Sequence, residues 1–221
     1  MKKLITYAVL ALLAVPGYGQ TPPLSPEGRD ALVNWHLCNP PEIAGSGLDF
    51  SAWGTRRFLG NTIKWRIKSG FQNMQFNWSA QQVMDNVAAK LGPTVAVVKV
   101  ASTDESAQLT FRTGTSINTQ FGQTLPVLGC ATNPTFASSV PPFNIYSKAE
   151  VVCIQNAAGP IILTHEVMWH LFFTFCHTAV SDSCGGYGGN RYPPSSGNCV
   201  PGQIEASKWI YQVPPGTFPP N

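Results

Sequence analysis

Charge is scarce in this sequence. Asp, Glu, Lys and Arg make up 11% of its 221 residues, roughly half of the share that is usual for a globular domain. The 14 basic residues exceed the 11 acidic ones by only 3, and they are scattered along the chain instead of forming a basic cluster. Because nucleic-acid recognition depends on a concentrated positive surface, the sequence argues against a nucleic-acid partner.

Long hydrophobic runs are also few. The main one, residues 4–15, follows two lysines and precedes the small residues Gly17 and Gly19. It is shorter than the ~20 residues that cross a membrane, and its flanks are typical of a secretory signal peptide spanning residues 1–19. No second run of membrane-spanning length occurs in the sequence. We therefore expect a secreted, extracellular protein without a membrane anchor.

The sequence is rich in residues typical of exported, loop-rich proteins, with 19 prolines, 20 glycines and 6 cysteines. An even number of cysteines in an exported chain predicts disulfide bonds. Pairing Cys184 with Cys199 would close a loop rich in glycine and proline, and pairing Cys130 with Cys153 would close the segment that precedes most of the histidines. The sequence leaves the connectivity open.

Two periodicities divide the chain into strands and helices. Alternating apolar residues predict strands, and apolar residues three and four apart predict helices. Strands are expected at residues 63–67, 95–101, 107–112, 143–146 and 151–154, the second of them buried on both faces. Helices are expected from Pro26, over 79–91 with Ser79 as cap, over 161–175 and over 203–211. Residues 45–60 and 114–142 are expected to form loops, and the tail from Val213 to be frayed.

Most of the chemistry is concentrated between positions 165 and 177, which hold three of the four histidines. Glu166 directly follows His165, and His170 comes later in the same apolar helix. Two histidines four apart on a helix, with a glutamate after the first, form the zinc site of many metallopeptidases. Here the histidines are five apart, so an ideal helix would turn them about 140° from each other. A π-bulge that accommodates Trp169 would realign them; otherwise only one histidine faces the site.

The residues at this cluster have defined chemical roles if they bind zinc. His165 and His170 are candidate ligands, and His177 is the candidate third ligand, with Cys176 as the alternative. Glu166 is the candidate general base, which takes a proton from a zinc-activated water and passes it to the leaving amine. The alternative interpretation is a buried helix whose histidines form local hydrogen bonds without a metal.

The order of these elements, together with Leu163-Thr164-His165-Glu166, resembles the catalytic domain of matrixin-type metzincins, which are secreted zinc peptidases. The resemblance covers roughly residues 60–212. It implies an α+β, zincin-like fold, in which a twisted mixed β-sheet packs on an active-site helix beside a small C-terminal loop-and-helix subdomain.

The resemblance also implies the organisation of the chain and its substrate. A catalytic domain at residues 60–213 would follow an N-terminal extension, residues 20–59, and precede a proline-rich tail, residues 214–221. The protein would be a metalloendopeptidase whose cofactor is Zn²⁺ and whose protein or peptide substrate lies extended along a sheet edge. We expect a monomer. Cys38 lies where some latent family members carry a zinc-blocking cysteine, although the oxidising extracellular environment favours a disulfide for this cysteine.

Several positions differ from the family pattern H-E-x-x-H-x-x-G-x-x-H. His170 matches only when one residue is treated as inserted, and Phe173 then stands where the family has glycine. With the same shift, Cys176 falls on the third-ligand position and His177 lies one residue beyond it. Arg191 replaces the methionine of the turn before Tyr-Pro. These differences favour a second hypothesis, a catalytically inactive relative that acts as a secreted binding or inhibitory module. An unrelated disulfide-rich domain is the third hypothesis.

Overall fold

The structure is a computed structural model, and it describes residues 21–33, 53–68, 74–140, 142–154, 163, 167, 171–172 and 202–220. The predicted signal peptide lies outside these residues. The described helices are α1 (Pro26–Ala31), α2 (Met74–Leu91) and α4 (Gln203–Gln212). The described strands are β1 (Arg57–Phe58), β2 (Thr62–Ile67), β3 (Ala96–Lys99), β4 (Leu109–Thr113), β5 (Ser116–Asn118), β6 (Thr124–Pro126), β7 (Cys130–Phe136) and β8 (Ile145–Cys153).

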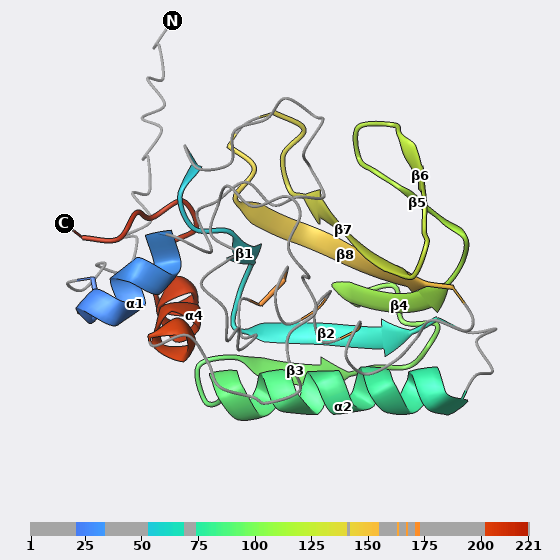
Figure 1. Ribbon diagram of the computed structural model, residues 1–221, viewed down its shortest axis with the longest axis horizontal. Coiled ribbons are helices and arrows are strands. Elements are labelled where there is room, and N and C mark those ends of the chain that lie inside the picture. Colours follow the sequence, from blue (N-terminus) through green and yellow to red (C-terminus); the bar gives the residue numbers. More distant parts are fainter. Residues whose placement is uncertain are drawn as a thin grey trace, which may run out of the picture.

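A mixed sheet of six strands forms the centre of the fold (Figure 1). Its order is β1-β8-β4-β2-β3, and all of these neighbours are parallel. β7 adds to β8 in the antiparallel direction, while β5 and β6 form a separate hairpin. The expected α+β class with a mixed sheet is therefore confirmed, and the sheet is mostly parallel.

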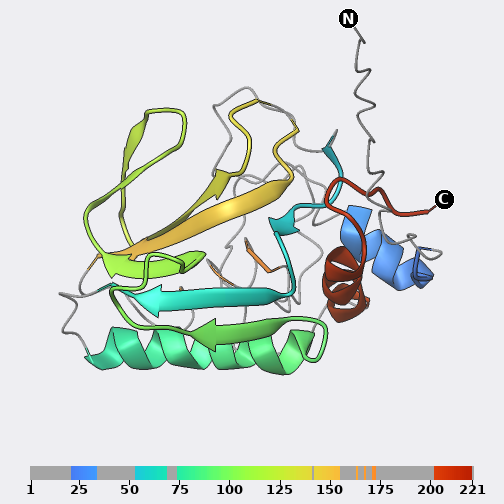
Figure 2. The same ribbon diagram turned by 180° about the vertical axis from the view of Figure 1, so that it is seen from behind.

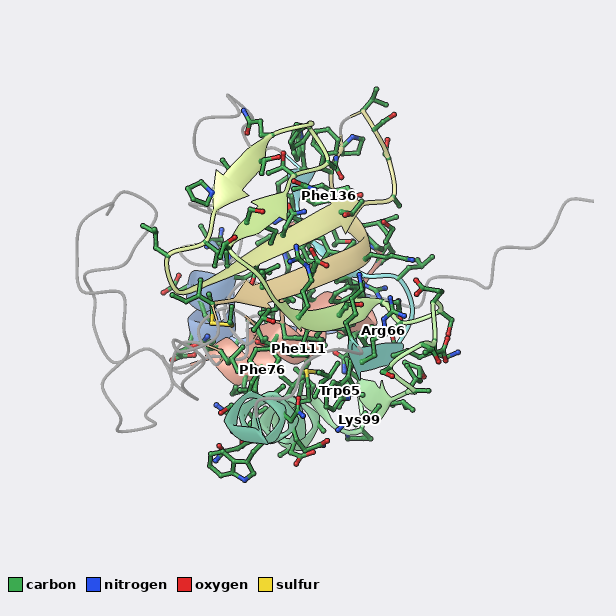
Figure 3. The ribbon with its side chains drawn as sticks, turned by 90° about the vertical axis from the view of Figure 1, so that its right-hand side faces the viewer. Trp65, Arg66, Phe76, Lys99, Phe111 and Phe136 are labelled. Atoms are coloured by element: carbon green, nitrogen blue, oxygen red, sulfur yellow. A yellow bond between two sulfur atoms is a disulfide. The ribbon has the colours of Figure 1, made fainter. Side chains whose placement is uncertain are left out.

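One face of the sheet carries the hydrophobic core. Trp65 of β2 and Phe111 of β4 are buried there with ring centroids 5.7 Å apart, and Phe76 of α2 lies 6.2 Å from Phe111. Figure 3 shows these three rings gathered between the sheet and α2. Alternation along β2 sends Lys64 and Arg66 to the opposite face, as the sequence predicts for a half-buried strand.

The opposite face of the sheet is polar and held by ion pairs. Arg66 binds the carboxylate of Glu105 at 2.8 Å, and Arg112 binds that of Glu150 at 2.6 Å. Arg66 also donates to the hydroxyl of Thr110 on the neighbouring strand at 3.2 Å. The burial of Arg66 is compatible with its charge because these partners replace the lost water.

Helix α2 is longer than the sequence predicts. It begins at Met74, and Ser79, which was expected to cap the helix, is fully buried inside it. The prediction was wrong because Phe76 and Ala80 continue the buried stripe toward the N-terminus and so extend the helix past the Ser79 pattern. The end of the helix at Leu91, before Gly92 and Pro93, agrees with the prediction.

Four predictions about strands and loops also need correction. β3 was expected to be buried on both faces, but it forms the edge of the sheet and is largely exposed. The expected loop at 114–142 contains β5, β6 and β7, and the expected loop at 45–60 contains β1. The two short strands predicted around positions 143–154 are one strand, β8. Short strands with proline or polar residues carry little periodicity, so tertiary pairing decides these cases.

A disulfide joins Cys130 of β7 to Cys153 of β8, which face each other across the antiparallel pair. This is one of the pairings that the sequence left open. The other cysteines, at positions 38, 176, 184 and 199, lie outside the described residues.

The N-terminal helix and the C-terminal segment pack together, as Figures 1 and 2 show from opposite sides. Ser25 donates from its backbone N–H to the carboxylate of Glu205 in α4 at 2.7 Å, and its hydroxyl binds the same carboxylate. The tail is not frayed, because the N–H of Thr55 donates to Thr217 at 3.1 Å and the N–H of Gly216 donates back to Thr55 at 2.9 Å. Gly216 has a φ of 86°, a backbone conformation that would be strained for a residue with a side chain.

None of the described helices is both long and apolar enough to cross a membrane.

Candidate active site

The candidate residues of the His cluster lie outside the described residues. They are the zinc ligands His165, His170 and His177 and the general base Glu166. The same holds for Cys176, Phe173, Arg191, His36 and Cys38. The site is therefore built from the described residues that share its segment, which are Leu163, Val167, Leu171 and Phe172.

These four residues anchor the segment in the main core of the protein. Leu163, Val167, Leu171 and Phe172 are all at most 3% exposed, and all belong to the same hydrophobic cluster as the sheet. The ring of Phe172 lies 5.7 Å from that of Phe58 in β1. These residues precede, separate and follow the first two histidines in the sequence, so the described residues on both sides of the predicted pair and between its members belong to the core.

The backbone of this segment contains a wide turn at Val167. The Val167 carbonyl accepts one hydrogen bond from the N–H of Leu171 at 3.1 Å, which is the α-helical pattern. It also accepts a bond from the N–H of Phe172 at 3.2 Å, five residues later, which is the π-type pattern.

Burial agrees with the wide turn. On an ideal α-helix, the side chain of Phe172 would point about 140° away from that of Val167. Both side chains are instead buried in one cluster, at 1% and 0% exposure. Leu171, which stands fourth after Val167 and makes the α-helical bond, is also buried at 3% exposure, so the buried face here is one residue wider than that of a regular helix.

A buried arginine lies in β1, the strand whose Phe58 contacts Phe172. Arg57 of β1 donates to the carbonyls of Phe58 at 3.2 Å and Val213 at 3.1 Å, and its guanidinium lies 5.4 Å from the ring centroid of Tyr211. Burial lowers the pKa of Arg57, and burial raises the pKa of the wholly enclosed Tyr211 phenol. The cluster fastens α4 and the tail to β1. The sequence did not predict this cluster, although two adjacent arginines are unusual in a chain with so few charged residues.

The edge of the sheet on the side of β8 is formed by β7. Among the described strands, β7 pairs with β8 alone. Strand edges are common binding places for extended peptides, so β7, like β3 at the opposite edge, is a described strand that could receive one.

The described residues outside the His cluster contain no group of three or more His, Cys, Asp or Glu side chains that could hold a metal. Since every histidine lies outside the described residues, this finding concerns the rest of the fold and not the cluster. No model of a known protein family and no curated protein matches this chain. The likeness to matrixins therefore depends on the residues and elements described above.

Proposed function

We propose that this protein is a secreted, zinc-dependent metalloendopeptidase of the matrixin-like, zincin type. The observation that carries the proposal is the π-type hydrogen bond from Phe172 to Val167. It bears on the main chemical objection to the site, which is the extra residue between His165 and His170.

The wide turn supports a shared metal for the two histidines. Val167 lies between His165 and His170 in the sequence, so a residue absorbed between Val167 and His170 would be removed from their helical count. Five residues with one absorbed are equivalent to four, and residues four apart lie within about 40° of each other on a helix. His165 and His170 would then lie on one face of the helix, as two ligands of one ion must.

The donor set suits zinc. His165, His170 and His177 would supply three imidazole nitrogens, which is a ligand set of catalytic zinc sites. When bound, zinc supplies Lewis-acid activation of a water molecule. Glu166, which is adjacent to the first ligand, would accept the proton of that water and donate it to the amine that leaves when the peptide bond breaks.

The sheet supports an extended substrate. A mixed sheet with an antiparallel strand at its edge offers backbone groups to a peptide that lies alongside it. The anchored segment and the β7–β8 pair belong to the same core, through Phe172, Phe58 and Tyr146. Substrate main chain along β7 is thus compatible with chemistry at the His cluster.

The function can be tested with casein hydrolysis and zinc content measured on the same preparations. We expect Glu166→Gln to keep its zinc and lose a factor of roughly 10² to 10⁴ in kcat, because it removes only the base. His165→Ala should lose both zinc and activity. A wild-type protein that holds zinc but cleaves no casein or denatured protein would favour the inactive binding module instead.

A further inference from the structure

The outer edge of β7 can be assigned from its pairing. Pro134 of β7 stands opposite Ala149 of β8, whose N–H donates to the Gln108 carbonyl at 2.7 Å, on the side away from β7. Opposite residues of an antiparallel pair turn their backbone groups either both toward each other or both away. Pro134 therefore turns its carbonyl to the outer edge, and as a proline it offers no N–H there.

The next outward donor along this edge belongs to Phe136, and a side chain of the same protein occupies it. The Phe136 N–H donates to the side-chain carbonyl of Gln120 at 2.6 Å. A glutamine side chain ends in a primary amide, so its carbonyl presents the same acceptor as a peptide backbone. Gln120 thus occupies the position that the backbone carbonyl of a bound peptide would take.

The hairpin that carries Gln120 is fixed to the sheet at several points. Gln120 lies in the turn between β5 and β6, and the Asn133 side chain donates to the Asn118 carbonyl at 2.7 Å. The ring of Phe121 lies 5.7 Å from that of Phe143, although Phe121 remains 43% exposed. At the other end of the hairpin, Ile117 packs on Val152 of β8. The turn is therefore held by side-chain hydrogen bonds and a partly exposed ring, and the base of the hairpin by buried apolar packing.

We propose that the β5–β6 hairpin is an internal competitor for the β7 edge, in which Gln120 occupies the Phe136 N–H until an extended peptide displaces it. This proposal rests on the proposed function, since it identifies the β7 edge as the substrate-binding edge. A peptide bound there accepts a hydrogen bond from Phe136 through a backbone carbonyl and donates a backbone N–H to Pro134. Binding of peptide and release of the Gln120 turn are thus coupled.

The test compares peptide affinity and amide exchange in matched variants of the full chain. All variants carry Glu166→Gln so that the probe, a short acetylated and amidated alanine–valine peptide, is not consumed. Gln120→Ala removes the competitor, and we expect it to bind the peptide roughly two- to tenfold more tightly, the value of one net hydrogen bond. In the free protein, the Phe136 amide should exchange faster in Gln120→Ala, and saturating peptide should restore its protection.

Two control variants separate the competitor from a general effect on the turn. Gln120→Glu keeps an acceptor at the same position, and because a carboxylate accepts more strongly than an amide, it should bind the peptide no more tightly than the parent does. Gln123→Ala changes an exposed glutamine of the same turn and should leave both affinity and Phe136 exchange unchanged. Equal or weaker peptide affinity in Gln120→Ala, or unchanged Phe136 exchange, contradicts the proposal.

Failure of this proposal can be told apart from failure of the proposed function. Casein cleavage is measured in parallel with Glu166 restored. Cleavage without any dependence of peptide affinity on Gln120 refutes the internal competitor and leaves the peptidase. Peptide binding that depends on Gln120, in a protein that cleaves nothing, refutes the peptidase and leaves the competitor at the β7 edge.

Discussion

Helix α2 and the segment around Val167 both bury an apolar face in the same core, but they do so with different backbones. The buried side chains of α2 follow the regular helical spacing of three and four residues, at Phe76, Ala80, Val83, Met84, Val87 and Leu91. The second segment buries Val167, Leu171 and Phe172, and adds the π-type bond at Val167. Such bulges occur often at functional sites, which supports the proposal that the site lies in this segment while the regular helix α2 serves as scaffold.

The largest effect is expected when the regular helix is given an extra residue. An alanine inserted after Met84 turns Val87 and Leu91 about 100° out of the core. Each loses roughly 1.5–3 kcal/mol of burial, and the total is comparable with the net stability of a small domain, ~5–15 kcal/mol. We expect no cooperative thermal unfolding by circular dichroism.

A matched insertion tests whether the position or the insertion itself is responsible. An alanine inserted after Gly122 extends the exposed turn between β5 and β6, where a Cβ at Gly122 would meet nothing within 4 Å. This variant should unfold cooperatively near the parent temperature. If both insertions behave alike, α2 does not depend on its regular spacing.

Truncations of comparable size should separate stability from metal binding. Phe172→Ala and Met84→Ala each remove a fully buried side chain, so each should lower the free energy of unfolding by ~2–5 kcal/mol in chemical denaturation. Only Phe172→Ala removes the packing that accompanies the wide turn. We expect zinc affinity to fall in Phe172→Ala and to stay at the parent value in Met84→Ala. Equal zinc affinity in the two variants would show that metal binding does not depend on the wide turn.

The smallest effect is expected on the polar face of the sheet, which neither apolar segment covers. The hydrogen bond and charge of Arg66 hold the pKa of Glu105 below its ordinary value of 4.5. A lowered folded-state pKa stabilises the fold above the unfolded pKa, and this contribution is lost as the pH falls through the folded value. Glu105 is exposed, so Glu105→Gln should lower the melting temperature slightly at neutral pH. The difference from wild type should vanish in acid; a constant difference would assign the effect to something other than this ionisation.

The sequence predicts those parts of the fold in which periodicity and burial agree. Alternation identified β2, and the apolar residues of α4, Trp209 and Ile210, identified the last helix. The end of α2 followed from Gly92 and Pro93. In each of these elements the local pattern and the tertiary contacts favour the same structure.

The sequence fails where contacts distant in the chain decide the structure. β7 contains Pro134 and polar residues, and only its pairing with β8 makes it a strand. The tail is ordered by Thr55, which lies more than a hundred residues earlier in the chain. Ser79 has the local pattern of a cap, but burial of Phe76 extends the helix beyond it.

The candidate site was predicted from residue types, and its geometry depended on a backbone feature that spacing could only suggest. The five-residue interval between His165 and His170 allowed either a π-bulge or a broken site. The bond from Phe172 to Val167 is the observation on which we propose the first of these. The occupation of the Phe136 amide by Gln120 had no local signal, because it joins two segments through a side chain.

The most direct test of the account is the zinc content of the purified protein by elemental mass spectrometry, with and without Trp169. Deletion of Trp169 gives His-Glu-Val-Met-His, the regular spacing, and Trp169→Ala keeps the length as a control. If the wide turn absorbs the extra residue, the wild type, the deletion and Trp169→Ala should each hold about one zinc per chain, and His165→Ala should hold none. Zinc in the deletion variant but not in the wild type would contradict the account, because the extra residue would then have broken the site.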